Sequence, residues 1–343
     1  MRLPAPSIER NNEQGTIIII VLLVLVVLSF LAMELSKETL IDHTSSVYVK
    51  SSITGNILCD SGRMLAKEIL VTDLEESKGD YNFETWGLFN TELEDISEEL
   101  TSGTLSGEIT DENSLFPINK LALLDKNTKK ITEQYQGVFL RMLKTLCSDL
   151  NLTSGTAEDL LISIRIWQGE QLSRASEDDT WYAAQKIPYT RTKKTFRSPD
   201  EMLLLYWPKA KESDIKKLYY GTDSVSGLRD LITIWGEGPI NMNTANETLT
   251  TAIPIANNNK EDFLNRMALY RNDPTSNFET TWYLNAAKFS GIEEKNIPKD
   301  ILDFKSNTFR VTLTADIGSG SKKEIIFLRR TDKKVVLLGS HGE

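Results

Sequence analysis

The chain has 343 residues, and 40% of them are apolar, which is enough for packed cores and excludes a disordered chain. Its formal net charge is −10 with a pI near 5.0, so a nucleic-acid partner, which requires clustered Lys and Arg against phosphates, is not expected. Two cysteines, Cys59 and Cys147, and two histidines, His43 and His341, exclude a disulfide framework and a cysteine-type zinc site and leave little for histidine catalysis. The cysteines could pair in an oxidising compartment, but two buried free thiols are the stronger expectation.

The strongest pattern is an apolar run at residues 17–33, in which Ser29 is the one polar side chain. As a helix rising about 1.5 Å per residue, the run is near the short end of what crosses a bilayer. Lipid offers no partners to backbone N–H and C=O groups, so the run must be helical despite its β-branched residues. A secretory signal peptide is the alternative, but the near-neutral start, the longer run and the poor exit site do not favour it. We therefore interpret residues 1–15 as a leader without folded structure and residues 16–35 as a transmembrane helix.

The helix is expected to continue beyond the membrane. Residues 34–71 contain no proline, and their apolar side chains fall on one broad helical face. We predict one helix over residues 16–71, and any break in it is expected near Gly55 or Gly62. The first half of this helix would lie in lipid and the second half would pack on a soluble domain.

Residues 77–107 are acidic and typical of a solvated helix face rather than a metal site, because no loop-forming glycine interrupts the carboxylates. Short apolar segments at residues 105–109 and 115–118 flank a polar turn at 110–114, which predicts a hairpin. Residues 36–118 then supply the helix and the first strands of one domain.

Helical periodicity dominates the middle of the chain, which we divide into a first subdomain, residues 119–237, and a second, residues 238–306. The predicted helices lie at residues 134–151, 157–167, 199–205, 247–253, 260–271 and 280–289. Ser198 and Pro199 are the expected N-cap and first turn of the third of these helices. Residues 168–198 are polar and rich in turn-forming residues, so this stretch is predicted to be irregular.

Strand periodicity returns in residues 307–343. Alternation predicts three antiparallel strands at residues 309–314, 324–329 and 335–338, joined by turns at 318–321 and 331–333. These strands have natural partners in the early helix and the first strands. The fold class is therefore α+β: a long N-terminal helix packed on a small antiparallel sheet, with a large, mostly helical insertion.

No motif for nucleotide binding, serine hydrolysis or zinc catalysis occurs in its required context, so we expect a protein that is not an enzyme. Residues 240–245, Ile-Asn-Met-Asn-Thr-Ala, resemble the entry to a helix-hairpin-helix module that binds nucleic acid. The glycine that permits close approach to phosphate is missing after Pro254, and the surrounding charge is acidic. We interpret this segment as a capped structural helix.

Four features occur together along the chain: Gly15 directly before the apolar helix; Gly-Glu-Ile-Thr-Asp-Glu-Asn-Ser-Leu-Phe-Pro-Ile-Asn-Lys-Leu at residues 107–121; Ser-Glu-Asp-Asp-Thr-Trp-Tyr at 176–182; and Gly-Pro-Ile-Asn-Met-Asn-Thr-Ala at 238–245. In this order and spacing they resemble the general secretion pathway protein K family, the minor pseudopilins K of bacterial type II secretion systems. The resemblance covers essentially the whole chain. It implies a pilin-like version of the fold described above.

The resemblance also implies how the N-terminus is processed. A prepilin peptidase would cleave between Gly15 and Thr16, and the new terminus at Thr16 would be methylated. Most pilin-like subunits carry a glutamate at the fifth mature position, thought to neutralise the terminus of the neighbour assembled before; here that position is Ile20. A carboxylate in lipid is costly unless paired, so its absence fits a subunit at the tip, with no predecessor.

Calcium is the one cofactor that the resemblance implies. The family has an aspartate-rich stretch around a tryptophan that contributes to calcium sites; here residues 166–171 read Ile-Trp-Gln-Gly-Glu-Gln, and Glu170 is the only acid. Glu177, Asp178 and Asp179 remain as candidate calcium ligands, although calcium takes six to eight oxygens.

Taken together, these features predict a minor pseudopilin at the tip of the type II secretion pseudopilus that initiates or caps the fibre and supports protein export across the outer membrane. The expected location is the inner membrane, spanned once, with the C-terminal body in the periplasm. Other minor pseudopilins, the pseudopilus, the prepilin peptidase and the inner membrane are the expected partners, without nucleic acid. The alternatives are a membrane-anchored nucleic-acid-binding or DNA-uptake module, a type IV pilus minor pilin, and an envelope enzyme that recruits His43 or a carboxylate.

Overall fold

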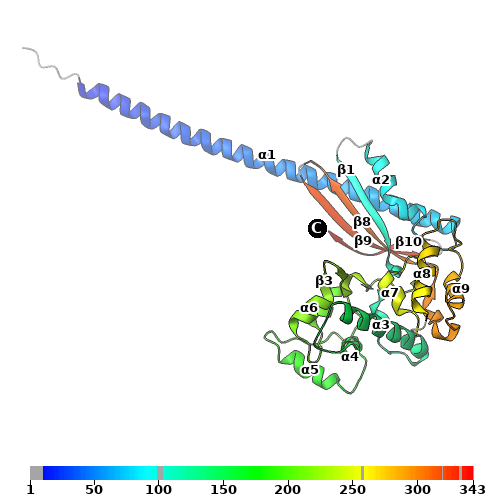
Figure 1. Ribbon diagram of the computed structural model, residues 1–343. Coiled ribbons are helices and arrows are strands. Elements are labelled where there is room, and N and C mark those ends of the chain that lie inside the picture. Colours follow the sequence, from blue (N-terminus) through cyan, green and yellow to red (C-terminus); the bar gives the residue numbers. More distant parts are fainter. Residues whose placement is uncertain (1–10, 99–102, 256–258, 319, 332–333, 343) are drawn as a thin grey trace, which may run out of the picture.

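The computed structural model describes residues 11–98, 103–255, 259–318, 320–331 and 334–342. Residues 1–10 of the expected leader, and parts of the turns expected at 318–321 and 331–333, lie outside these ranges. One very long helix leads to two bodies, one built around a four-stranded sheet and the other mostly helical (Figure 1). We call them the sheet body and the helical body.

The long helix α1 runs unbroken over Asn11–Glu76, 66 residues. It begins inside the expected leader, so the prediction that residues 1–15 lack folded structure is wrong for the last five. The break expected near Gly55 or Gly62 is absent. Both glycines instead face the sheet: a Cβ on Gly62 would lie 2.9 Å from Leu313, and one on Gly55 would lie 2.9 Å from Ile317. Their missing side chains let the helix approach the sheet closely.

The sheet has the order β1-β8-β9-β10, and every neighbouring pair is antiparallel. Its strands are β1 Thr104–Asp111, β8 Thr308–Asp316, β9 Ser321–Thr331 and β10 Lys334–Gly342. The first strand and the second are therefore separated by the whole helical body in sequence but are neighbours in space, with Asp111 opposite Phe309.

The hairpin predicted at residues 105–118 is wrong. The segment after β1 forms a short turn, η2 Glu112–Ser114, and then strand β2 Phe116–Pro117, which pairs in parallel with β5 Ile232–Thr233 in the helical body. The two apolar segments were correctly recognised as extended, but each finds a partner far away in the chain. Local spacing alone cannot distinguish this arrangement from a hairpin.

One face of the sheet is covered by the C-terminal part of α1, which contacts all four strands. Helix α2, Phe89–Glu98, contacts β1, and a short turn η1, Thr85–Leu88, precedes it. In α2, Phe89 and Leu93 are buried while Glu92, Glu94 and Asp95 are exposed, which confirms the predicted solvated acidic helix. The core of the sheet body consists of Leu58, Cys59, Ala66, Leu70, Trp86, Phe89, Leu93, Leu105, Ile109, Phe309, Val311, Leu313, Ala315, Ile326 and Leu328.

The helical body contains α3 Lys129–Asp149, α4 Ala157–Trp167, α5 Ala175–Ala183, α6 Glu212–Tyr220, α7 Glu247–Ala252, α8 Lys260–Arg271 and α9 Trp282–Phe289. Short 3-10 turns connect them: η3 Ile118–Lys120, η4 Lys126–Thr128, η5 Pro199–Leu204, η6 Leu228–Asp230, η7 Glu294–Asn296 and η8 Lys299–Ile301. Two further strand pairs are β3 Gly221–Thr222 with β4 Val225–Ser226, antiparallel, and β6 Ile240–Asn241 with β7 Leu302–Asp303, parallel.

Helices α4 and α8 have the predicted bounds, whereas residues 168–198, predicted to be irregular, contain α5. That helix was missed because its buried positions are Ala175, Asp178 and Tyr182, and a buried carboxylate does not register as an apolar face. Ser198 caps η5 together with Glu201 as a capping box, but the segment is a 3-10 turn rather than an α-helix.

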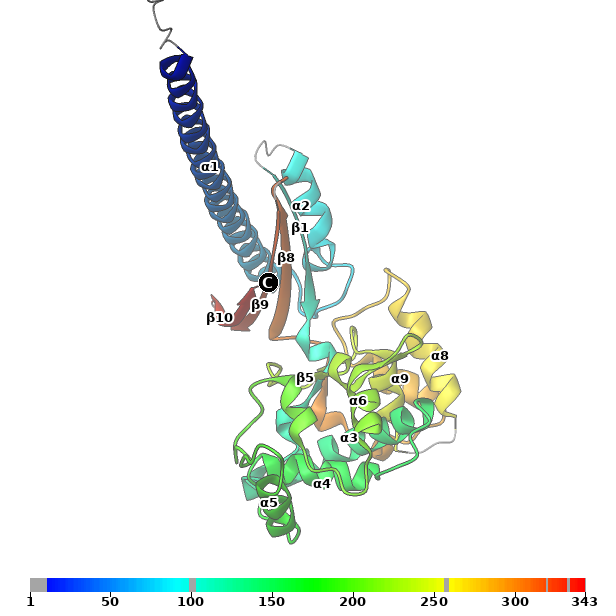
Figure 2. The same cartoon turned by 90° about the vertical axis from the view of Figure 1, so that its left-hand side faces the viewer.

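A single apolar core runs through the helical body and includes residues from both subdomains expected in the sequence, such as Phe139 and Leu249. Arg141 of α3 also donates to the carbonyl oxygens of Ala252 and Ile253, at 2.7 and 3.1 Å. Figures 1 and 2 show the helical body beyond the sheet, at the end of α1 remote from its apolar segment. The arrangement confirms the predicted α+β fold with a long N-terminal helix and a helical insertion.

Candidate functional site

The apolar segment of α1 is the first candidate surface. The large apolar side chains of residues 17–33 are 47–73% exposed. Within the described residues, α1 is the one helix long and apolar enough to cross a membrane. The helix is consistent with a single-pass membrane anchor.

The predicted processing residues lie at the start of this helix. Gly15, Thr16 and Ile20 are helical and exposed, and a Cβ on Gly15 would have no atom within 4 Å. The structure places the three residues on the exposed surface of α1, and it does not by itself test their processing. The apolar side chain of Ile20 is 56% exposed, and the apolar side chains beside it are exposed to a similar degree.

The exposed apolar surface continues past residues 17–33, because the sheet begins to cover α1 only near Gly55. Its large apolar members there are Leu35, Leu40, Ile41, Val47, Tyr48, Val49 and Ile53. A stretch of helix with this many uncovered apolar side chains is typical of an interaction surface. We call residues 34–53 the bare segment of α1.

The second candidate site is a buried polar junction between the two bodies. Asn241, from the middle of the helical body, donates through Nδ2 to the Asp111 carboxylate at 3.0 Å, to the Ser306 hydroxyl at 2.8 Å and to the Asp80 carbonyl at 2.9 Å. Asp111 ends β1, and Ser306 lies just before β8. Asn241 therefore bonds three parts of the sheet body: the end of β1, where the chain leaves it, the segment before β8, where the chain returns, and the loop after α1.

Ser306 and Asn243 complete the junction. The Ser306 hydroxyl donates to Asp111 at 2.6 Å, and its backbone N–H donates to the Asp80 carboxylate at 2.7 Å. Asn243 donates to the Phe278 carbonyl at 2.9 Å and accepts from the Trp282 indole at 2.7 Å. Every side chain here is satisfied by a named partner, so the junction fixes the bodies with directional bonds in addition to apolar contact.

Arg330 anchors the sheet side of the junction. Its guanidinium donates to Asp73 at 2.5 Å, contacts Asp80, and lies 4.8 Å from the ring centre of Phe309. Burial raises the pKa of Asp73 to about 6 and that of Asp111 to about 6. For Asp73, the nearby Asp80 carboxylate adds to this shift and Arg330 opposes it.

A second contact, which we call the latch, lies on the sheet face away from α1. The Trp235 ring stacks on Phe327 with centres 4.6 Å apart, and Arg329 pairs with Glu237 at 3.1 Å. A Cβ on Gly339 would lie 2.7 Å from the Trp235 ring, so the glycine makes room for the indole. The helical body thus touches the sheet at two separate places, the junction and the latch.

The segment likened to a helix-hairpin-helix entry is part of the junction. Asn241, Asn243 and Ala245 are buried, and the N-cap of α7 is Asn246, which accepts from the N–H of Thr248 at 2.8 Å. The structural interpretation of this segment is correct, but its asparagines tie the two bodies together rather than cap a helix. No phosphate could reach them.

Sequence reasoning missed Asp80 and Arg330. A signal existed for Arg330: alternation in β9 places it in the buried phase of Ile326 and Leu328, where a cation requires a partner. Asp111 is similarly in phase with Ile109, which is buried. Which partner each charged group finds depends on tertiary structure that alternation does not encode.

The predicted calcium ligands lie in α5 and do not fit a calcium site. Both oxygens of Asp179 accept from Arg191, at 2.6 and 3.1 Å, and Asp178 accepts from Arg174 at 2.9 Å. Glu177 accepts from the Tyr206 hydroxyl at 3.0 Å. The other oxygen of Asp178 is buried without a hydrogen-bond partner, but one free oxygen falls far short of the six to eight that calcium takes.

Glu170, the remaining acid near Trp167, also has a cation: Arg165 donates to both of its oxygens, at 2.9 and 2.6 Å. Cys59 and Cys147 are both free thiols, as expected from the sequence, and burial raises the pKa of each. Both thiols are therefore poor nucleophiles.

No protein-family model matches the chain, and no curated protein matches it. Among solved structures it is similar to a chain in the crystal structure of the GspK-GspI-GspJ complex from the enterotoxigenic Escherichia coli type 2 secretion system, with a TM-score of 0.61 and 16% identity. The match covers 86% of this chain and 97% of that chain. At this identity the likeness shows the fold, and it confirms the predicted pilin-like arrangement with a helical insertion.

Proposed function

We propose that this chain is a minor pseudopilin of a type II secretion system, anchored in the inner membrane by α1 and located at the tip of the pseudopilus, with both bodies in the periplasm. The observation that carries the proposal is α1 itself. Its first half is exposed and apolar, its second half is the core helix of the sheet body, and no break separates the two. A helix of this kind can leave the bilayer and pack among similar helices without refolding.

The bare segment is the natural contact surface for such neighbours. It lies outside the apolar run that fits a bilayer and before the part of α1 that the sheet covers. Leu40 and Tyr48, 66% and 70% exposed, would be buried against the helices of partner subunits. The likeness to a chain of a three-subunit pseudopilin complex supports partners of the GspI and GspJ kind.

The helical body supports a place at the tip. It lies at the end of α1 opposite to the apolar segment (Figure 1), where a subunit added above would have to pack. We propose that it blocks such addition and so initiates or caps the fibre. Ile20, in place of a carboxylate, fits the same position, because a subunit without a predecessor has no terminus above it to neutralise.

Two rivals remain distinguishable. The interpretation as a nucleic-acid-binding module is no longer supported by residues 240–245, because these residues belong to the buried junction. A type IV pilus minor pilin shares the anchor and the fold, so the identity of the partner subunits decides between the two.

Co-purification tests the proposal. The full chain, extracted in detergent, is expected to capture GspI-like and GspJ-like subunits from the same secretion system at micromolar concentration. Leu40→Asp in the bare segment should weaken capture about tenfold or more, because it places a charge in an apolar interface. Leu269→Asp, at a 74% exposed position of the helical body, is the matched control and should leave capture unchanged. Capture of type IV pilus subunits alone, or no capture, contradicts the proposal.

Processing provides an independent test. We propose cleavage by a prepilin peptidase between Gly15 and Thr16, with methylation of Thr16. Amino-terminal sequencing and mass measurement of the membrane-extracted protein should show a start at Thr16, carrying one additional methyl group. An intact Met1, or a start after Met33, would remove the pseudopilin interpretation.

A further inference from the structure

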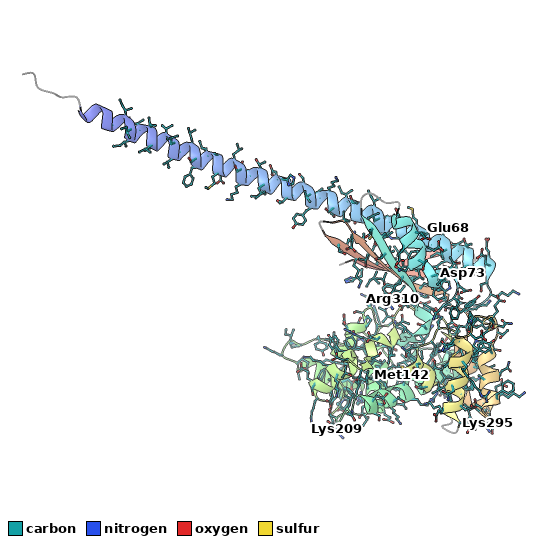
Figure 3. The ribbon with its side chains drawn as sticks, turned by 45° about the horizontal axis from the view of Figure 1, so that its top comes forward. Glu68, Asp73, Met142, Lys209, Lys295 and Arg310 are labelled. Atoms are coloured by element: carbon teal, nitrogen blue, oxygen red, sulfur yellow. The ribbon has the colours of Figure 1, made fainter. Side chains whose placement is uncertain are left out.

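The face of the sheet that points away from α1 forms one wall of a cleft. Alternation in β8 and β9 turns Arg310, Ile325 and Phe327 away from the core that α1 covers. Across a cleft of about 360 Å³ they face residues 197–200 and 232–235 of the helical body. Figure 3 shows Arg310 where the sheet body meets the helical body. The cleft is therefore built from both bodies and lies on the opposite side of the sheet from α1.

Three arginines line this cleft, Arg197, Arg229 and Arg310. None of the three donates a side-chain hydrogen bond to another described residue, whereas every other described arginine donates at least one. A guanidinium carries five N–H donors in one plane. The described arginines whose donors are all unused are therefore gathered at one place.

Nearby carboxylates do not use these donors. Arg197 forms no ion pair with a described residue. The Nε of Arg229 lies 3.4 Å from an oxygen of Asp230, and the Nε of Arg310 lies 3.6 Å from an oxygen of Glu112, but neither contact has the geometry of a hydrogen bond. The side chains of Arg229 and Arg310 are 48% and 36% exposed, so a ligand in the cleft can reach their N–H groups.

A basic segment leads into the cleft. Residues 184–198 contain five lysines and arginines and no acid, in a chain whose net charge is −10. Three of the five are exposed lysines without an ion-pair partner among the described residues: Lys186, Lys193 and Lys194. Asp200, the next acid along the chain, already accepts a hydrogen bond from the Tyr219 hydroxyl at 2.6 Å. The cleft and this segment together favour a ligand with several negative charges.

From these contacts we propose that the cleft binds a short acidic segment of a partner protein, in which carboxylates alternate with apolar side chains. A guanidinium and a carboxylate can form two parallel hydrogen bonds, which fixes the orientation of the ligand as well as its charge. Leu115, Ile325 and the rings of Trp235 and Phe327 also line the cleft, so apolar side chains of the same segment would be buried there.

Other anionic ligands fit this cleft less well. A membrane surface is too flat to enter a concave space between two bodies, and inorganic phosphate would leave the apolar wall unused. The proposal goes beyond the secretion role and does not depend on it. Its test uses no partner subunit, so it can fail while the proposed function stands.

Peptide binding to the full chain in detergent tests the proposal. The probe is a short fluorescent peptide of alternating glutamate and leucine, and its binding is followed by fluorescence anisotropy. We expect it to bind about tenfold or more tightly than the matching glutamine and leucine peptide, and salt should weaken the binding. The double variant Arg197→Gln, Arg229→Gln should reduce the affinity about tenfold or more. Arg266→Gln in α8, at a 44% exposed position, is the matched control and should leave the affinity unchanged.

A second variant separates hydrogen bonding from charge alone. Arg310→Lys keeps a cation next to Glu112, so it should leave the fold intact, but it should still weaken peptide binding because lysine lacks the planar pair of donors. Equal binding of the glutamate and glutamine peptides, or unchanged affinity in the double variant, would overturn the proposal. Binding of anionic phospholipid vesicles or duplex DNA that the double variant abolishes, without peptide binding, would also overturn it and indicate a phosphate site.

Discussion

At the scale of single residues, the junction depends on charged side chains that are costly to bury. Their hydrogen-bond and ion-pair partners offset this cost. Arg330 and Asp111 each lie in the buried phase of a strand that is otherwise apolar on that face. Removing one partner should therefore lower the free energy of unfolding by much more than the intact pair adds to it.

Arg330→Leu should lower the free energy of unfolding by about 3–5 kcal/mol, because it leaves Asp73 and Asp80 buried without their cation. Denaturant unfolding measures the change. Arg229→Leu is the control: its guanidinium is about half exposed, pairs with Asp230 and lies over the Tyr220 ring, so a loss of about 1 kcal/mol or less is expected. Equal effects of the two substitutions would show that burial at the junction does not matter.

Asp111 predicts an unusual pH dependence. Burial raises the folded pKa of Asp111 from 3.8 to about 6. Between these two pH values Asp111 is protonated in the native state and ionised in the unfolded chain. The sign follows: stability falls as pH rises from about 4 to about 6, by about 3 kcal/mol for this group, and stays lower above that range.

Asp111→Asn should remove this part of the pH dependence, whatever its effect on absolute stability. Unfolding midpoints between pH 4 and pH 7 provide the slope. Asp179→Asn is the control and should leave the slope in this range unchanged, because Arg191 lowers the pKa of that carboxylate from 3.8 and its contribution changes only at lower pH. An unchanged slope in Asp111→Asn would contradict burial as the cause.

At the scale of elements, the two bodies are held by contacts of different kinds, hydrogen bonds at the junction and ring stacking at the latch. The latch involves one loop, residues 234–237, placed against β9 and β10. Because the contact is local, it can be broken without touching either core.

Trp235→Ala should make the connection between the bodies more sensitive to protease while costing about 1–3 kcal/mol, since it removes a stacked aromatic pair. Gly339→Val should do the same from the sheet side, because its side chain would meet the rigid indole. Trp181→Ala, which removes a similar stack with Tyr206 inside the helical body, is the control and should not expose the connection. Cleavage at the same sites and rates in all three variants would show that the latch does not hold the bodies.

The elements also show how far the sequence could lead. The α+β class, the solvated acidic helix, α4, α8 and the three C-terminal strands follow from periodicity, because each repeats its pattern long enough to be read locally. The prediction of a hairpin after Leu105 was wrong because the sequence of an extended segment does not indicate which strand it pairs with. The prediction missed helix α5 because Asp178 occupies a core position. The asparagines at 241 and 243 were recognised as a motif, but nothing in the sequence indicated that they would bond Asp80.

At the scale of the whole molecule, the insertion connects two strands that are already neighbours. Asp111 at the end of β1 lies opposite Phe309 in β8, so the chain leaves and re-enters the sheet body at one point. The cores of the two bodies are separate. The sheet body should therefore be an independent folding unit.

Replacing residues 112–308 by Asn-Gly, a turn that closes a two-residue hairpin, should give a chain that keeps α1 and the four-stranded sheet. Cooperative unfolding with circular dichroism of helix and strand is the expected result. Met142→Asp in the full chain is the complementary variant: it charges the core of the helical body and should unfold that body alone (Figure 3). An excised chain that aggregates or lacks cooperative unfolding would show that the sheet body depends on the insertion.

The unbroken helix has a mechanical consequence. Sixty-six helical residues at about 1.5 Å each form a rod about 100 Å long, without proline, in which Gly55 and Gly62 pack against the sheet. Without a proline or another helix break, such a helix bends only gently. We therefore expect an axial displacement applied at its apolar end to be carried along the helix to the sheet body.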